Sequence, residues 1–249
     1  MSARVCVASA LTLLALAFSP PSAYAMGINL SWDDCGAYGA EVKTFACDRN
    51  AIPGTASLIG SFVPPAGSTA VTGEEAVLDV NDGGWRTIPD WWQFKYVGAC
   101  RRTALTASAD FTAYQNCADY WIGLAQGGVT AYITPYYGDA ARARLLLIFA
   151  TALANTGPLD EHLEYYAFRV TISGAKTVGT DACAGCSREM CIRFTSLKLT
   201  QPIGVGDYRI DNGEQRPWVL WQSKGVVVGC NAVIPTRNST WGAIKSQYR

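Results

Sequence analysis

Residues 165–172 read YYAFRVTI, and in this stretch strongly apolar positions alternate with more polar ones. An alternation of period two is typical of a β-strand that buries one face and leaves the other wetter. The expected buried face holds Tyr166, Phe168, Val170 and Ile172. The opposite face would hold Tyr165, Ala167, Arg169 and Thr171. The stretch therefore predicts a strand within a half-buried sheet.

Segments of the same kind recur along the chain, and Gly, Pro, Asn or Asp separates one from the next. Short β-branched and aromatic runs divided by turn residues are typical of a sandwich or jelly roll. We therefore expect an all-β fold, namely an antiparallel, jelly-roll-like β-sandwich stapled by disulfides. The further expected strands are residues 28–32, 42–47, 57–63, 75–80, 129–134, 142–150, 191–200 and 218–221.

Two of these segments depart from simple alternation. In residues 192–199 (IRFTSLKL) the pattern slips by one position at Thr195-Ser196, which predicts a β-bulge. Residues 142–150 (RARLLLIFA) form a continuous apolar run. Such a run fits either a strand buried on both faces or a helix, and periodicity alone does not decide between them.

The first 25 residues have the layout of a secretory signal peptide. Arg4 precedes an apolar run over residues 5–18, and Ala23-Tyr24-Ala25 is a small-x-small cleavage site. The run is too short to span a hydrocarbon core of about 30 Å comfortably. We expect cleavage after Ala25 and a secreted product, periplasmic or extracellular, without a membrane segment.

The remaining sequence predicts one β-sandwich domain over residues 26–232 and an irregular polar tail over 233–249. The chain carries 20 basic and 20 acidic residues, so it has no electrostatic reason to bind nucleic acid. It also lacks the polybasic patch that recognises anionic membranes. Charged residues make up only 16% of the chain and aromatic residues 11%, which indicates a large core rather than disorder.

Eight cysteines remain once Cys6 is removed with the signal peptide, and an even number in an exported protein predicts four disulfides. Spacing favours Cys35–Cys47 and Cys100–Cys117. The other four would form two bridges, either Cys186–Cys191 with Cys183–Cys230 or the crossed alternative.

The stretch DACAGCSREMC (residues 181–191) holds three of these cysteines and admits two other interpretations. Cys183, Cys186, Cys191 and Cys230 would fit a four-thiolate zinc site, but a zinc ribbon usually has a second CxxC and none is present. A redox CxxC normally opens a helix after a strand, whereas here Gly179-Thr180 precedes it. We therefore expect Cys183 and Cys186 to take separate disulfide partners, and no metal.

Eight short motifs between residues 28 and 230 resemble those of a group of exported bacterial proteins that has no assigned activity. The resemblance implies export, a bacterial source and paired cysteines, and it supplies no catalytic residues. The motifs are SWDDC (31–35), TFACD (44–48), IPDWWQ (88–93), GACR (98–101), EYYAF (164–168), AKTVG (175–179), CAGC (183–186) and WQ (221–222).

Catalysis has little support in the sequence. His162 is the only histidine and lies in a polar loop, and neither GxSxG nor HExxH is present. A glycosidase needs only two carboxylates about 5 to 10 Å apart. An exported carbohydrate-active hydrolase is therefore the alternative function. Its candidate carboxylates are Glu74 and Glu75 with Asp79, or Glu161 with Glu164.

The preferred interpretation is a secreted, non-catalytic module that acts at or outside the cell surface, in binding or as a structural component. Adjacent tryptophans in a strand would point to opposite faces, so one of Trp91 and Trp92 would be free to stack on a glycan. Trp85, Tyr136 and Tyr137 are further platform candidates.

No cofactor is required by this interpretation. The pairs Asp33-Asp34 and Asn81-Asp82 offer the oxygen ligands that a structural Ca²⁺ takes. However, no DxDxDG loop is present, and acidic residues in turns usually cap backbone N–H groups.

Overall fold

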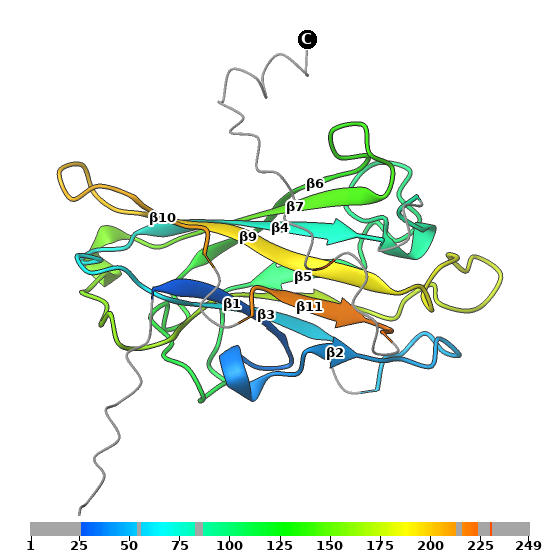
Figure 1. The fold of residues 1–249 in the computed structure, drawn as a ribbon, viewed down its shortest axis with the longest axis horizontal. Coiled ribbons are helices and arrows are strands. Elements are labelled where there is room, and N and C mark those ends of the chain that lie inside the picture. The colour runs from blue at the N-terminus through cyan, green and yellow to red at the C-terminus, as the bar shows by residue number, and fades with distance from the viewer. Residues whose placement is uncertain (1–25, 54–55, 83–86, 213–215, 224–229, 231–249) are drawn as a thin grey trace, which may run out of the picture.

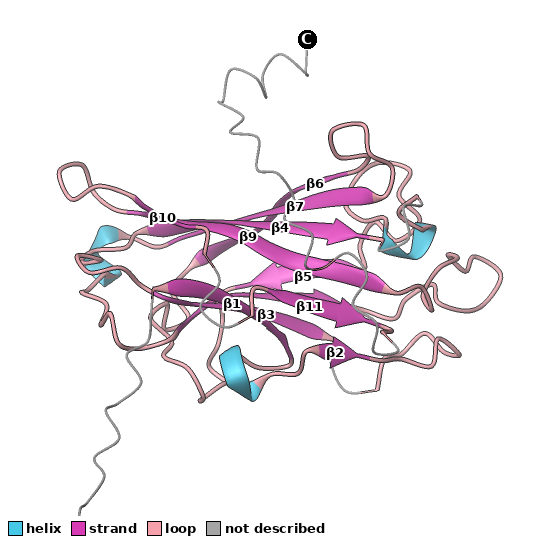
Figure 2. Cartoon of the chain, in the orientation of Figure 1, coloured by secondary structure: helices cyan, strands magenta, loops and turns pink. Residues whose placement is uncertain are grey.

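The computed structural model describes residues 26–53, 56–82, 87–212, 216–223 and 230, which form two β-sheets packed face to face (Figure 1). Figure 2 shows that strands and loops dominate this part of the chain. Its helices are three 3₁₀ turns, η1 (Gly36–Tyr38), η2 (Asp90–Trp92) and η3 (Leu153–Asn155). The predicted all-β sandwich is confirmed, while the signal peptide and the tail lie outside the described residues.

The smaller sheet has four antiparallel strands in the order β1-β3-β8-β5. The larger sheet has seven strands, and its main path is β2-β11-β9-β4-β7-β6, with β10 paired to β9. Every pairing is antiparallel except that of β11 with β2. The strands are β1 (Gly27–Trp32), β2 (Val42–Lys43), β3 (Ser57–Val63), β4 (Gly73–Asn81), β5 (Leu105–Ser108), β6 (Gln126–Ile133), β7 (Arg142–Ala150), β8 (Tyr165–Ile172), β9 (Met190–Thr200), β10 (Tyr208–Ile210) and β11 (Trp218–Trp221).

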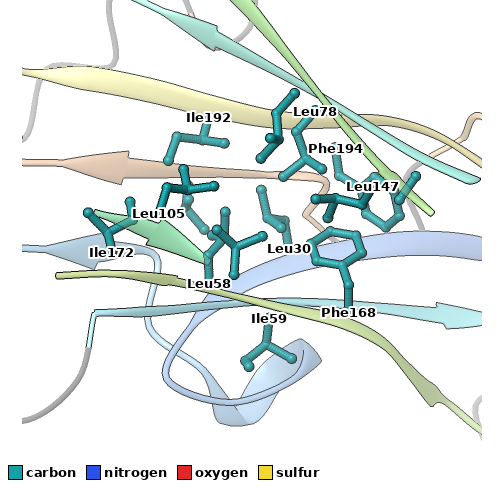
Figure 3. Packing of buried hydrophobic residues seen from close by; sticks show 14 of the residues in the cluster. Leu30, Leu58, Ile59, Leu78, Leu105, Leu147, Phe168, Ile172, Ile192 and Phe194 are labelled. Carbon is teal, nitrogen blue, oxygen red and sulfur yellow. The ribbon is translucent and has the colours of Figure 1, made fainter. Parts of the chain in front are cut away.

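The core lies between the two sheets, where alternate residues of each strand meet (Figure 3). Phe168 of the smaller sheet contacts Phe194 of the larger sheet, with ring centres 4.9 Å apart. Gly60, opposite Phe168 in the register, makes room for that ring, because a Cβ there would lie 2.3 Å from it. Burial of apolar area between the sheets is the main stabilising term of such a fold. Across this layer, side chains of the smaller sheet face side chains of the larger sheet. The smaller sheet contributes Leu30, Leu58, Leu105 and Ile172, and the larger sheet contributes Leu78, Leu147 and Ile192.

The apolar run at residues 142–150 forms β7, which is buried on one face only. Ala143, Leu145, Leu147 and Phe149 point into the core, whereas Ile148 is 42% exposed on the outer face. Both the helix alternative and the expectation of two buried faces are therefore wrong. Because the outer face also carries Leu and Ile side chains, the alternation of buried and exposed positions does not appear in the sequence as an alternation of apolar and polar residues.

The predicted bulge in β9 is confirmed. Val77 pairs with Ser196 and Leu78 with Phe194, so Thr195 is the extra residue. A second bulge lies in β8, where Ser61 pairs with Tyr166 and Gly60 with Phe168. Neighbouring residues on β3 point to opposite faces, so Tyr166 does not share a face with Phe168, contrary to the simple alternation.

Tyr166 instead packs under a loop that covers the outer face of the smaller sheet. Its ring stacks on Phe111 with centres 4.5 Å apart. Its hydroxyl donates to Asp34 and accepts from the backbone N–H groups of Asn116 and Cys117. The bulge thus anchors the loop that precedes β6.

The structure contains four disulfides, as predicted, but the predicted pairs are wrong. The bridges are Cys35–Cys117, Cys47–Cys186, Cys100–Cys183 and Cys191–Cys230, with Cα–Cα distances of 5.6 to 6.4 Å. Proximity in sequence misled the pairing because three of the four bridges join segments 82 to 139 residues apart, which the fold brings together. The expectation that Cys183 and Cys186 take separate partners is confirmed. Their thiols are consumed in these bridges, which contradicts the zinc and redox interpretations.

No helix in the part of the chain that the structure describes is long and apolar enough to cross a membrane.

Candidate binding site on the outer face of the larger sheet

Trp91 and Trp92 are not a binding platform, contrary to the sequence interpretation. They lie on the 3₁₀ turn η2 rather than on a strand, and their exposures are 0% and 1%. The turn lets both indoles point inward, with ring centres 5.3 Å apart. Trp85 lies outside the described residues.

Both indoles pack on Trp221, which is the centre of a buried aromatic cluster. Its ring centre lies 5.2 Å from that of Trp91, 5.6 Å from that of Trp92 and 5.8 Å from that of Trp32. The Nε1–H of Trp221 donates to the carbonyl of Cys186 at 2.8 Å. The cluster therefore ties β1, β11 and η2 to the loop that carries two of the disulfides.

Arg101 packs against one side of this aromatic cluster. Its guanidinium carbon lies 3.5 Å from the ring centre of Trp91, and its nitrogens donate to the carbonyls of Trp91, Ser173 and Ala175. Burial lowers the pKa of Arg101 to about 9. Most of the motifs that carry the resemblance contribute to this assembly, which gives them a structural role.

Tyr136 and Tyr137 lie on the hairpin that joins β6 to β7, seen at the upper right of Figure 1. Their ring centres are 4.4 Å apart. Tyr137 is 53% exposed and has φ +51°, in the left-handed region that bulky residues rarely adopt. With Gly138 at φ +77° it forms the two-residue turn between Tyr136 and Asp139, and a hairpin turn of this kind requires positive φ at both positions. The structure thus brings together these two predicted residues, with one ring presented to solvent.

Arg144 supports the tyrosine pair from the strand below. Its guanidinium carbon lies 4.1 Å from the ring centre of Tyr136, a cation–π contact. The same guanidinium donates to both carboxylate oxygens of Asp79, at 2.6 and 2.7 Å. Burial alone would lower the pKa of Arg144, but the hydrogen bond and charge of Asp79 raise it above its ordinary value. Burial also raises the pKa of Tyr136, so its hydroxyl stays protonated.

The Arg144–Asp79 pair belongs to a row of side chains that crosses the outer face of the sheet. Trp218 on β11 is directly opposite Arg193 on β9, Arg193 is opposite Asp79 on β4, and Asp79 is opposite Arg144 on β7. Trp218, Arg193 and Arg144 are partly exposed. We call the four residues together with Tyr136 and Tyr137 the outer-face row.

Sequence patterns did not identify three members of the row, Arg144, Arg193 and Trp218. Arg144 and Asp79 do occupy outward positions in their strands, and this was a usable signal. Their meeting, however, depends on the register between strands that are far apart in the chain.

The candidate carboxylate pairs of the hydrolase alternative do not face one another. Glu74 points into the core and Glu75 outward, because they are neighbours on β4. Glu75 and Asp79 share the outer face but lie about 13 Å apart along the strand, beyond the glycosidase range. Glu164 accepts hydrogen bonds from Asn29 and Ser61, and Glu161 lies in an exposed turn beside the solvent-exposed His162.

An open groove of about 550 Å³ lies between β5 and β6, and none of its lining residues belongs to the outer-face row. No carboxylate lines it. Its lining consists of Lys95, Thr106, Ala107, Gly127, Gly128, Val129, Thr130 and Ile148.

The oxygen pairs considered for Ca²⁺ are engaged by protein donors. Asp33 binds Lys43, Asp34 accepts from Tyr166 and Asn116, and Asp82 is bound by Arg188. Among the described residues, no group of three or more His, Cys, Asp or Glu side chains is arranged to hold a metal ion.

No protein-family model matches the sequence, and no curated protein matches it. Among solved structures, the chain is similar to a cohesin module from the family 33 glycoside hydrolase of Clostridium perfringens ATCC13124. The two share 9% sequence identity at a TM-score of 0.33, over 76% of this chain and 98% of the module. A similarity this low carries no functional argument.

Proposed function

We propose that this protein is an exported, non-catalytic β-sandwich module that binds a glycan at or outside the cell surface through the outer-face row. The observation that carries the proposal is the exposed ring of Tyr137, held beside Tyr136 above the Arg144–Asp79 pair. Four disulfides in one chain are typical of exported proteins, which agrees with the place of action.

The chemistry of the row suits a sugar. A tyrosine ring offers a rigid, amphipathic surface at a low cost in conformational entropy, and the apolar face of a sugar ring can stack on it. The hydroxyls of the same sugar need hydrogen-bonding groups nearby, which Tyr136 and the exposed part of Arg144 supply. Because Asp79 fixes Arg144, these groups are positioned before the ligand arrives.

Affinity electrophoresis in gels that contain soluble polysaccharides tests the proposal. We expect at least one polysaccharide to retard the wild-type protein, and Tyr137→Ala to weaken this binding roughly tenfold or more, as for a central aromatic contact. Tyr38→Ala is the matched control, because Tyr38 is also exposed, at 66%, but lies on η1. Equal retardation of both variants would refute the role of Tyr137.

A second candidate function, a structural component of a surface assembly, is favoured by exposed apolar loops at one end of the sandwich. The start of β4 pairs with the ends of β7 and β9, and the start of β6 pairs with the end of β7, so the loops beyond them share that end (left in Figure 1). Grouped apolar side chains of this kind mark interaction surfaces. The exposed residues there include Ile122, Leu124, Leu153, Ile203 and Val205.

Sedimentation velocity over a range of protein concentrations tests this second candidate. Wild-type protein should self-associate, and Ile203→Asp combined with Leu153→Asp should keep it monomeric. Val97→Asp is the control, since Val97 is 83% exposed but follows η2 at the opposite end. A wild-type protein that stays monomeric at every concentration would remove self-assembly as the function.

A further inference from the structure

The outer-face row and its neighbours carry an excess positive charge. Arg142 forms an ion pair with Asp139 at 3.0 Å, and Arg144 forms one with Asp79 at 2.6 Å. Arg193 is the third arginine of this region, and no carboxylate among the described residues lies within ion-pair distance of it. Among the described residues, Arg142, Arg144 and Arg193 are thus balanced by only two carboxylates, those of Asp139 and Asp79.

Arg193 is held in place by a backbone carbonyl and has no carboxylate partner among the described residues. Its Nη1 donates to the carbonyl of Cys230 at 3.3 Å, and Cys230 is fixed by its disulfide to Cys191. The opposing residue on β4 is Asp79, but both oxygens of that carboxylate accept from Arg144. Among the described residues, the guanidinium of Arg193 has no other hydrogen-bond partner, and the side chain is partly exposed.

The position of Arg193 fits a chain-like ligand that starts at the tyrosines. Neighbouring strands are about 4.8 Å apart, so Arg193 lies roughly 10 Å from Arg144 across the sheet. A short oligosaccharide that stacks on Tyr137 and runs along the row would reach it. Trp218, directly opposite Arg193 on β11, provides a second aromatic side chain at the far end.

We infer that the glycan bound by this protein is an acidic polysaccharide, and that Arg193 pairs with its anionic group. This inference rests on the proposed function and names its ligand class. A planar guanidinium with free donors matches a carboxylate or a sulfate by paired hydrogen bonds. Neutral sugars would leave the excess charge of Arg193 without a partner.

Two pairs of polymers test the inference by affinity electrophoresis. Polygalacturonate is compared with its methyl ester, which has the same backbone with masked carboxylates, and dextran sulfate is compared with dextran. We expect the wild-type protein to bind the charged member of at least one pair about tenfold more tightly. A preference within the first pair would indicate recognition of carboxylates, and a preference within the second pair would indicate recognition of sulfates.

Arg193→Gln should abolish this preference, by lowering the affinity for the charged member to that for its uncharged counterpart. The matched control is Arg209→Gln, because Arg209 lies on β10 with its side chain 62% exposed and its removal changes the net charge equally. Added salt should weaken the charged interaction in the wild-type protein more than in Arg193→Gln.

Equal binding within both pairs, a preference that survives Arg193→Gln, or an equal loss in Arg209→Gln would overturn the inference. Failure to bind any of the four polymers would also overturn it for these acidic classes. Tyr137→Ala, measured in the same gels, separates the two proposals. If it abolishes binding to charged and uncharged polymers while Arg193→Gln keeps the preference, the proposed function stands and the inference fails.

Discussion

Arg144 donates two hydrogen bonds to the carboxylate of Asp79, and only 4% of Asp79 is exposed. This nearly buried pair sets the position of the guanidinium on which Tyr136 rests. This part of the site is therefore built on strands β4 and β7, and the hairpin contributes only the rings of Tyr136 and Tyr137. A site held by strands is more precisely positioned than one that depends on loops alone.

Asp79→Ala should destabilise the protein by about 2–3 kcal/mol, because it leaves the partly buried Arg144 without its acceptors. Urea denaturation of both proteins measures this loss. Glu75→Ala is the control on the same face of the same strand, where the carboxylate is 3.6 Å from Lys198 and half exposed. Its effect should stay within about 0.5 kcal/mol. Similar losses for the two variants would contradict the role of the Asp79–Arg144 pair.

Glu74 predicts a pH dependence of stability. Its side chain points into the core at 1% exposure, and neither carboxylate oxygen has a hydrogen-bond partner in the described structure. Burial raises the pKa of Glu74 to about 8, from 4.5 for an ordinary glutamate. The folded state thus keeps a proton that the unfolded state loses.

The contribution of Glu74 is fully present below pH 4.5 and is lost as the pH rises toward 8. Within that window the free energy of unfolding should fall by up to about 1.4 kcal/mol per pH unit relative to Glu74→Gln. Urea denaturation at several pH values across the window checks this. A wild-type curve parallel to that of Glu74→Gln would show that Glu74 is ionised in the folded state.

Trp221→Ala should destabilise the protein by about 3–5 kcal/mol, because it opens a cavity at the centre of the aromatic cluster. Trp218 lies three residues earlier on the same strand but is partly exposed on the outer face. Trp218→Ala should cost less than half as much. Thermal or urea denaturation of the two variants provides the comparison, and equal losses would contradict the central position of Trp221.

Peptide mapping without reduction should recover the bridges Cys47–Cys186 and Cys100–Cys183 as crosslinked peptides after cleavage between Cys183 and Cys186. Both bridges tie the loop of residues 183–186 to segments that flank the aromatic cluster. Recovery of Cys35–Cys47, or of a Cys183–Cys186 bond, would contradict this arrangement.

The sequence predicted what local patterns determine. The bulge at Thr195 was readable because residues on either side of it keep a clear alternation, and the existence of disulfides followed from the number of cysteines. The bulge in β8 was not readable, since Tyr166 is apolar enough for either face. Its position shows only when the register with β3 is known.

The site was predicted only in part, for the same physical reason. Tyr136 and Tyr137 were proposed as platform residues from their residue types alone, and the structure places both on one hairpin. Trp91 and Trp92 were misassigned because two adjacent tryptophans in a sequence are compatible with either a strand or a 3₁₀ turn. The alignment of Arg193, Asp79 and Arg144 depends on the register between three strands, which only the tertiary structure determines.

Isothermal titration calorimetry tests the central claim, that the outer-face row binds a glycan, most directly. Wild-type protein, Tyr137→Ala and Tyr38→Ala would each be titrated with oligosaccharides prepared from the polysaccharide that retards the wild type most. If the row binds the glycan, Tyr38→Ala binds like the wild type and Tyr137→Ala binds at least tenfold more weakly. Unchanged affinity of Tyr137→Ala would contradict it.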